Sequence, residues 1–145
     1  MLLKLKIFIR ENRELFFQFV RFSLVGLSGT LIDVGLLNLL HEGLGVFVYT
    51  AATIAFTAAV INNFLLNKYW TFRHRAGYKS RGSVQFFQFI FVSLVGLLIN
   101  LGIMYLLIEF LDLWFNWAKA AAIIVVLFWN FVANKLWTFR TKEPL

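Results

Sequence analysis

Residues 62–73 read NNFLLNKYWTFR and residues 129–140 read WNFVANKLWTFR, with eight of the twelve positions identical. Each stretch lies where a long apolar segment meets a basic one. A second similar pair precedes them, because residues 16–26 read FFQFVRFSLVG and residues 86–96 read FFQFIFVSLVG. Self-similarity at a nearly fixed spacing is typical of a repeated structural unit. We therefore expect two copies of one unit, and repeated membrane units often form a site between their copies.

The composition indicates an integral membrane protein. Of 145 residues, 61% are hydrophobic and 14% are charged, and the mean hydropathy is +0.78. A soluble domain contains about 45–50% apolar and about 25% charged residues. Cysteine is absent, which excludes disulfides, thiol catalysis and thiolate metal sites. No histidine and carboxylate cluster has metal-ligand spacing, so we expect neither a metal nor another cofactor.

Four apolar stretches are long enough to cross a bilayer, which takes about 20 helical residues. They are approximately residues 19–40, 47–66, 88–111 and 116–133. The predicted fold is thus an all-α membrane domain of two helical hairpins, residues 19–76 and residues 77–145, the second with a basic C-terminal tail. Because each hairpin contains two spans, the two copies share one orientation and form parallel-topology repeats.

The distribution of lysine and arginine predicts the orientation. With these four spans, thirteen of the fourteen cations fall on one side of the membrane. The exception is Lys119, which we expect to pair with Glu109 or Asp112. By the positive-inside rule both termini are cytoplasmic. Residues 1–18 are predicted to form an amphipathic helix on the inner leaflet, and this use of the positive charge argues against nucleic acid as a partner.

Small residues in the first and third spans are expected to form the packing seam between helices, since close backbone approach favours helix association in lipid. The glycines concerned are Gly26, Gly29, Gly35, Gly96 and Gly102.

Asp33 is the most informative polar residue inside the membrane. An ionised aspartate at the centre of a span costs about 2.5–3.5 kcal/mol on insertion scales. Its counterpart in the second unit is Asn100, an uncharged side chain of similar shape. Two interpretations stay open, either a packing hydrogen bond or a role in ligand binding or gating.

Asparagine, lysine and arginine recur together in the two similar stretches. In each stretch two asparagines are four residues apart and share a helix face, and a lysine, a tryptophan and an arginine follow. Amides and cations suit an anionic headgroup, although an interfacial belt would also explain the tryptophans and cations. Arg21, which aligns with Phe91, either snorkels to the headgroups or binds phosphate. The candidate ligand-binding residues are Arg21, Asp33, Asn62, Asn63, Asn67, Lys68, Arg73, Asn100, Asn130, Asn134, Lys135 and Arg140.

The order of three motif groups is also informative. They are residues 21–26 (RFSLVG) with Thr30 and Asp33, residues 63–64 (NF) with 70–72 (WTF), and residues 130–131 (NF) with 137–139 (WTF). In this order the chain resembles the GtrA-like family of small four-helix membrane proteins. The resemblance implies a role in moving polyprenyl-phosphate-linked sugars across the bacterial cytoplasmic membrane for the glycosylation of cell-surface polysaccharides.

The expected function is therefore that of a flippase for a polyprenyl-phosphate-linked monosaccharide, with no catalytic residues. Its expected partners are this lipid-linked sugar, the membrane lipids, a separate membrane glycosyltransferase and a second copy of the chain. A non-transporting anchor or accessory subunit of the glycosyltransferase is the alternative. A small drug exporter is a third option, although the many cations favour an anionic ligand.

Overall fold

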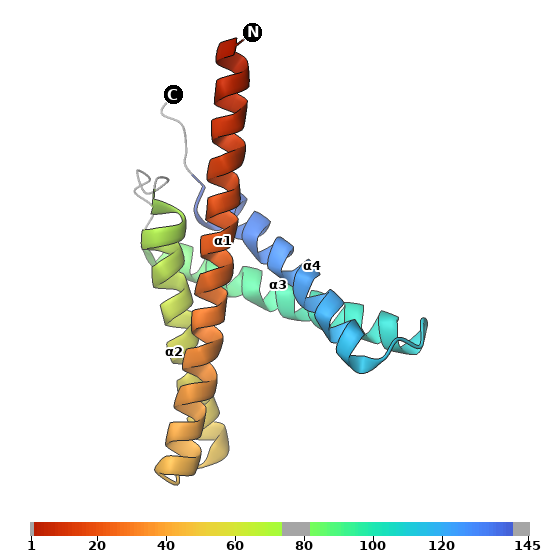
Figure 1. Ribbon diagram of the computed structural model, residues 1–145. Helices are drawn as coiled ribbons and strands as arrows, with labels where there is room; N and C mark the ends of the chain where they lie inside the picture. The colour runs from red at the N-terminus through yellow and green to blue at the C-terminus, as the bar shows by residue number, and fades with distance from the viewer. Residues whose placement is uncertain (1, 74–81, 141–145) are drawn as a thin grey trace. The chain divides into compact units, whose positions relative to one another are not determined.

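A computed structural model describes the backbone of residues 2–73 and 82–140, and the side chains within these ranges from residue 12 onward. The described residues form four long helices and three short π-helical turns (Figure 1). The long helices are α1 (Leu2–Asn38), α2 (Val48–Leu66), α3 (Gly82–Glu109) and α4 (Phe115–Ala133). The π-helical turns that follow three of them are η1 (Leu39–Gly43), η2 (Asn67–Thr71) and η4 (Asn134–Thr138).

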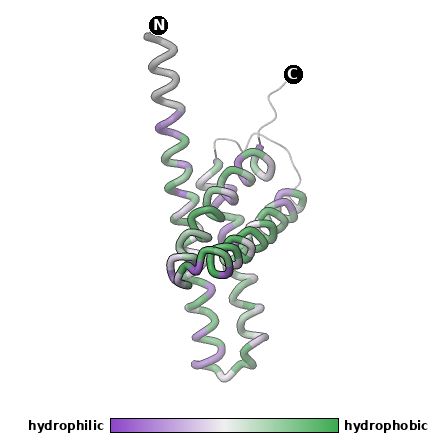
Figure 2. The backbone as a smooth tube through the Cα atoms, turned by 90° about the vertical axis from the view of Figure 1, so that its right-hand side faces the viewer, coloured by the Kyte–Doolittle hydropathy of each residue, from purple (hydrophilic) through white to green (hydrophobic). Residues whose placement is uncertain are grey.

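All four helices are long and apolar enough to span a membrane, which confirms the predicted all-α membrane fold. The candidate spans are Asn12–Gly43, Val48–Thr71, Gly82–Glu109 and Phe115–Thr138. Only 11–22% of the residues in their most apolar windows are buried inside the protein. Figure 2 shows that apolar residues predominate along the long helices, and many of their large apolar side chains are exposed, which suits contact with lipid.

The amino-terminal segment is helical without interruption. Helix α1 continues through residue 18, where we predicted a boundary between an interfacial helix and the first span. The placement of residues 1–18 on the inner leaflet stays a prediction. Residues 74–81 and 141–145, which include much of the predicted basic loop and tail, lie outside the described residues.

The chain divides into two compact units, Met1–His74 and Arg75–Leu145. In the first unit α1 packs on α2, and in the second α3 packs on α4. Alanines at intervals of four residues are buried in each contact. They are Ala51, Ala55 and Ala59 on α2, and Ala118 and Ala122 on α4. Each hairpin therefore has buried small residues on its second helix, where we had not predicted them.

Only two of the predicted seam glycines face the partner helix closely. A Cβ atom at Gly29 would overlap the side chain of Asn63, and one at Gly96 would lie 2.8 Å from Oδ1 of Asn130. The prediction is wrong for the other three, because a Cβ atom would meet nothing within 4 Å at Gly26, Gly35 or Gly102.

Aromatic packing defines how the two units correspond. The ring centroids of Phe22 and Phe72 are 6.2 Å apart in the first unit, and those of Phe89 and Phe139 are 6.5 Å apart in the second. Both members of the first pair recur in the second unit after 67 residues. The buried Val25 likewise corresponds to the buried Val92.

This packing register differs from the sequence similarity between residues 16–26 and residues 86–96, which requires a spacing of 70. The identical letters are thus displaced by three residues, about 4.5 Å or nearly one helical turn. Our alignment of Arg21 with Phe91 is therefore wrong. The position that corresponds to Arg21 in packing is Gln88.

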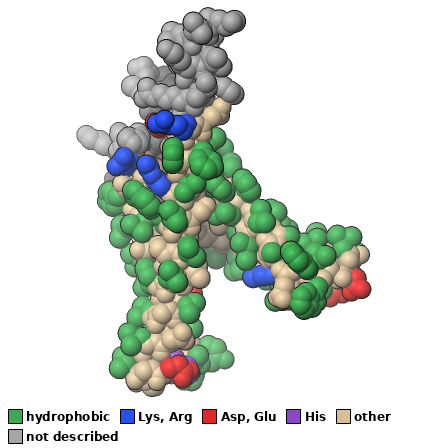
Figure 3. Space-filling view, in the orientation of Figure 1, with side chains coloured by type: hydrophobic (Ala, Val, Ile, Leu, Met, Phe, Trp, Pro, Cys, Tyr) green, Lys and Arg blue, Asp and Glu red, His purple; other side chains and the backbone are tan. Residues whose placement is uncertain are grey.

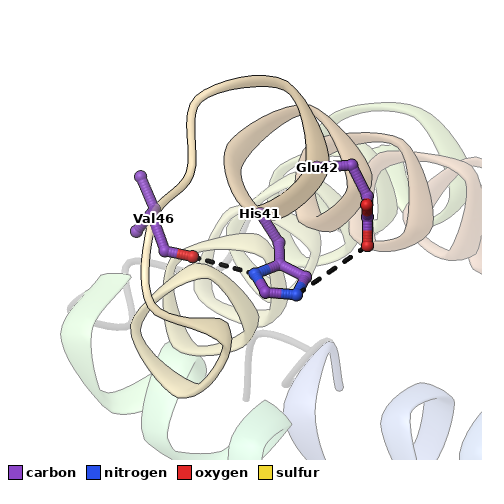
Figure 4. A network of polar contacts seen from close by, with 3 residues as sticks. All are labelled: His41, Glu42 and Val46. Atoms are coloured by element: carbon purple, nitrogen blue, oxygen red, sulfur yellow. Dashed lines mark hydrogen bonds and ion pairs between the residues drawn. The ribbon is translucent and has the colours of Figure 1, made fainter.

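A polar contact closes the turn of the first hairpin. In Figure 4, the Nδ1 atom of His41 lies 2.9 Å from the carbonyl oxygen of Val46, and Nε2 lies 3.8 Å from Oε1 of Glu42. The backbone N–H of Val46 donates to the carbonyl oxygen of Leu40 at 2.9 Å. Gly45 has a φ angle of +66°, which glycine adopts without steric cost.

Candidate functional site

The end of each hairpin opposite its connecting turn has the same local structure. We call residues 67–73 and 134–140 the basic ends of the first and second unit. In each, a backbone N–H donates to the carbonyl five residues earlier, from Phe72 to Asn67 at 2.9 Å and from Phe139 to Asn134 at 2.8 Å. Such π-helical turns occur frequently at functional sites.

The wider turn buries two polar side chains at each basic end. Asn67 and Thr71 are 2% and 0% exposed, and Asn134 and Thr138 are 1% and 3% exposed. Among the described residues, neither the Oδ1 atoms of these asparagines nor the Oγ1 atoms of these threonines have a hydrogen-bond partner. Oδ1 of Asn130 is buried without a partner as well. Such groups are rare in proteins, because each costs about 1–3 kcal/mol.

The two threonine hydroxyls differ from other hydroxyls of the long helices. Elsewhere in the membrane helices a hydroxyl donates to the carbonyl four residues earlier, as Ser93 does to Phe89 at 3.0 Å. For Thr138 the corresponding carbonyl belongs to Asn134, and in the wider turn this oxygen accepts the N–H of Phe139 instead of that of Thr138. Our sequence analysis did not include the threonines in the site, although both belong to the identical letters WTFR.

The two predicted lysines lie over aromatic rings. Nζ of Lys68 is 5.6 Å from the ring centroids of both Phe64 and Tyr69, and Nζ of Lys135 is 5.8 Å from that of Phe131. Cation–π attraction of this kind contributes about 0.5–2 kcal/mol, depending on exposure. It holds each ammonium group beside the helix on which it lies.

Exposed arginines complete the basic ends. Arg73 and Arg140 directly follow the buried Phe72 and Phe139, and each is exposed. Trp70 and Trp137 are 39% and 48% exposed. In Figure 3 the lysine and arginine side chains of the first unit gather toward its basic end. The arrangement combines two cations with an amphipathic tryptophan, which suits a membrane boundary.

Most predicted amides lie between the helices of their own hairpin. Nδ2 of Asn62 donates to Oγ of Ser28 at 3.1 Å and lies 3.4 Å from Oδ1 of Asn63. Asn63 occupies the space above Gly29. The contacts with Ser28 and Gly29 connect α2 to α1, so both amides contribute to the packing of the first hairpin.

The second unit repeats part of this arrangement. The side chain of Asn130 faces Gly96. The backbone carbonyl oxygen of Asn130 accepts a hydrogen bond from Nδ2 of Asn134 at 2.8 Å. Trp129 occupies the position that corresponds to Asn62, and its Nε1 donates to the carbonyl oxygen of Val92 at 3.1 Å. The contact between the helices is thus preserved with a different donor.

Asp33 and Asn100 have different environments. Asp33 is partly buried and forms no hydrogen bond or ion pair with any residue that the structure describes. Oδ1 of Asn100 accepts a hydrogen bond from Nζ of Lys119 at 3.4 Å. The predicted pairing of Lys119 with Glu109 or Asp112 is therefore wrong within the described part of the chain. Arg21 is partly buried and has no hydrogen bond or ion pair there either.

The structure thus separates the predicted site residues into two groups within each unit. The lysines lie within the π-helical turns and Arg73 and Arg140 follow these turns, whereas most of the amides lie inside the hairpin. Asp33 is four residues, about 6 Å, along α1 from Gly29, and so lies nearer the connecting turn than Asn63 does.

This fold and the two basic ends define an all-helical, multi-pass membrane protein with a cationic boundary region in each half. Residues 21–139 match the family described as GtrA/DPMS, transmembrane domain. The chain belongs to this family, as the sequence analysis indicated.

Two relatives are similar to most of the chain. A dolichol-phosphate mannosyltransferase from Pyrococcus furiosus is 32% identical over 124 residues, which cover 84% of this chain and 34% of the relative. The chain thus spans about a third of the length of that protein. The uncharacterized membrane protein YngA from Bacillus subtilis is 29% identical over 119 residues, which cover 82% of this chain and 77% of YngA.

Proposed function

We propose that this protein moves a polyprenyl-phosphate-linked monosaccharide across the cytoplasmic membrane. The family supports a membrane role related to such lipids. The name of the Pyrococcus furiosus relative indicates transfer of mannose to a polyprenyl phosphate, and the similarity covers most of this chain. In this proposal both termini are cytoplasmic, and the two units are copies of one ancestral hairpin.

The observation that carries the proposal is the pair of basic ends. A phosphate and a sugar must both lose water to enter hydrocarbon, which costs several kcal/mol for each unpaired polar group. Lys68 and Arg73 in one unit, and Lys135 and Arg140 in the other, offer cations at the membrane boundary. Charge-assisted hydrogen bonds to phosphate are about twice as strong as neutral ones. The basic ends would therefore recruit the phosphate and offset part of its desolvation.

Polar groups farther along the helices would then accept the sugar. Asp33 lies in the span without a partner among the described residues, and an unpaired carboxylate in a membrane span indicates a functional site. Sugar hydroxyls donate hydrogen bonds to carboxylates and amides, so Asp33, Asn62, Asn63 and Asn100 would line the path. The polyprenyl tail would stay in lipid.

The chain itself would form no covalent bond in this proposal. A separate membrane glycosyltransferase would attach the sugar to the lipid phosphate. A homodimer would enclose more volume than four helices do. The alternative function is a non-transporting anchor or accessory subunit of the glycosyltransferase, with the same lipid contacts.

A transport assay without any glycosyltransferase distinguishes these two functions. The purified protein is reconstituted into liposomes that contain mannosyl citronellyl phosphate, and external periodate, which does not cross the bilayer, oxidises the exposed sugar. We expect protein-containing vesicles to expose the sugar of the inner leaflet, so that oxidation proceeds beyond the outer-leaflet fraction seen with empty liposomes. If the protein binds the lipid but oxidation stops at that fraction, the accessory role is correct and the flippase proposal is wrong.

A further inference from the structure

The second unit carries a charged contact that the first unit lacks. Nζ of Lys119 on α4 donates to Oδ1 of Asn100 on α3 at 3.4 Å. In the packing register of 67 residues, the corresponding residues of the first unit are Ala52 and Asp33. The first unit therefore has an acid with no cation at this level, and the second has a cation with an uncharged amide.

Lys119 lies at the end of α4 that is remote from the basic end. It is four residues, about 6 Å, from the start of the helix at Phe115. Lys135 lies sixteen residues farther along, which corresponds to about 24 Å, against a hydrocarbon thickness of about 30 Å. The exposed Trp114 and Trp117, at 71% and 66%, flank Lys119 as an interfacial belt would. Helix α4 and its extension η4 thus carry one lysine toward each end, at a separation close to the thickness of the hydrocarbon core.

The contact between Lys119 and Asn100 is rich in hydrogen-bond donors. A lysine ammonium has three donors and an asparagine amide has two. The hydrogen bond between them uses one lysine donor and the amide oxygen, and neither residue has a further partner among those described. No described carboxylate lies within ion-pair distance of Lys119. Four N–H donors and one positive charge are left for a ligand, and this combination matches the oxygens of a phosphate.

We propose that Lys119 and Asn100 form a second phosphate-binding site, which takes the phosphate ester of an isoprenoid lipid at the membrane boundary opposite the basic ends. This inference rests on the proposed function, in which it supplies the site that receives the phosphate after translocation. It goes beyond that function because it assigns Lys119 to ligand binding and limits the site to the second unit.

Lysine footprinting tests the site without any transport. The full-length protein in nanodiscs is treated with an amine acetylating reagent, and the modification rate of Lys119 is followed by mass spectrometry against citronellyl phosphate concentration. Citronellol, inorganic phosphate and phosphatidylglycerol serve as separate arms, which distinguish the tail, the free anion and an ordinary anionic lipid. We expect saturable protection by citronellyl phosphate alone.

The Asn100→Asp variant tests the role of the amide. The new carboxylate would pair with Lys119 and repel phosphate, so the apparent Kd of citronellyl phosphate should rise roughly tenfold, the effect of one charge-assisted hydrogen bond. Asn38→Asp makes the same change at an exposed position near the connecting turn of the first unit, and should leave the Kd within about twofold.

The site is refuted if Lys119 is not protected, if any of the other three compounds protects it equally, or if Asn100→Asp leaves the Kd unchanged. These outcomes are separate from those of the transport assay. Protection of Lys119 without sugar movement would refute the flippase and leave the site in place. Sugar movement without protection of Lys119 would refute the second phosphate-binding site and support the flippase.

Discussion

The contact between Gly96 and Asn130 allows a quantitative prediction about hairpin packing. A Cβ atom at position 96 would lie 2.8 Å from Oδ1 of Asn130 and 3.3 Å from Cγ1 of Val126. Both distances are shorter than ordinary van der Waals contact, so Gly96→Ala must displace the amide or separate α3 from α4. Overpacking of this kind costs about 1–3 kcal/mol.

A matched control removes the intrinsic helix preference from the comparison. Replacing glycine by alanine in a helix interior stabilises it by about 1 kcal/mol, and this gain applies equally at Gly102, where a Cβ atom meets nothing within 4 Å. Gly102→Ala should therefore be neutral or stabilising. The difference between the two variants isolates the overpacking cost, and we expect Gly96→Ala to be less stable than Gly102→Ala by about 1–3 kcal/mol.

Unfolding in mixed micelles by increasing SDS provides the measurement, with tryptophan fluorescence as the signal. Trp129 is a suitable probe because its Nε1 donates to Val92 across the same helix pair. Adding Asn130→Ala to Gly96→Ala removes the overlapping atoms and should recover part of the loss. Equal stability of Gly96→Ala and Gly102→Ala would refute the described contact between α3 and α4.

Three further predictions concern single polar groups. Asp33→Asn replaces a carboxylate in the first span with an amide, so it should make insertion of that span more favourable in a glycosylation-mapping assay. The gain should be smaller than the cost of an aspartate, about 2.5–3.5 kcal/mol, because asparagine is itself polar; unchanged insertion would contradict the cost assigned to the carboxylate. Thr138→Val replaces a buried hydroxyl that has no described partner with a methyl group of similar size, so SDS unfolding should give equal stability or a gain of up to about 1 kcal/mol, whereas a clear loss would show that the hydroxyl is hydrogen-bonded. Trp129→Phe removes the hydrogen bond to Val92 and should cost about 0.5–1.5 kcal/mol in the same unfolding assay followed by the remaining tryptophans, and no loss would contradict that bond.

The length and apolarity of four stretches of sequence were sufficient to predict the membrane spans. Each predicted stretch falls, to within two residues, inside one observed helix and its π-helical extension, since only residue 47 lies before α2 and residues 110–111 lie after α3. They agree because hydrocarbon thickness limits the length of an apolar helix. The offset of 67 residues is evident between residues 62–73 and 129–140, but its extension to the start of the first helix of each unit was not predictable in this way. Lipid-facing positions accept many apolar residues, so similar letters at residues 16–26 and 86–96 do not require equivalent contacts. Only packing against the second helix, as in the Phe22–Phe72 pair, fixes the register.

The candidate site was predictable to a different extent for cations and amides. Lysine and arginine of the basic ends lie beside or beyond the helix ends because their charges favour the membrane boundary. The orientation of the amides depends on packing that a single sequence does not reveal. Asn63 faces inward because Gly29 leaves space for it, and Asn67 does so because the turn widens to five residues after it. The pairing of Lys119 with Asn100 depends likewise on the register between α3 and α4.

The rate of sugar exposure in proteoliposomes tests the central claim most directly when the two basic-end lysines are neutralised together. We predict that Lys68→Gln combined with Lys135→Gln slows periodate oxidation of the inner-leaflet mannosyl citronellyl phosphate by about tenfold or more, since each lysine would contribute a charge-assisted hydrogen bond to the phosphate. Arg13→Gln removes one exposed cation outside the basic ends and should leave the rate within about twofold. An unchanged rate in the double variant, with correct folding shown by SDS unfolding, would contradict the claim that the basic ends recruit the lipid phosphate for transport.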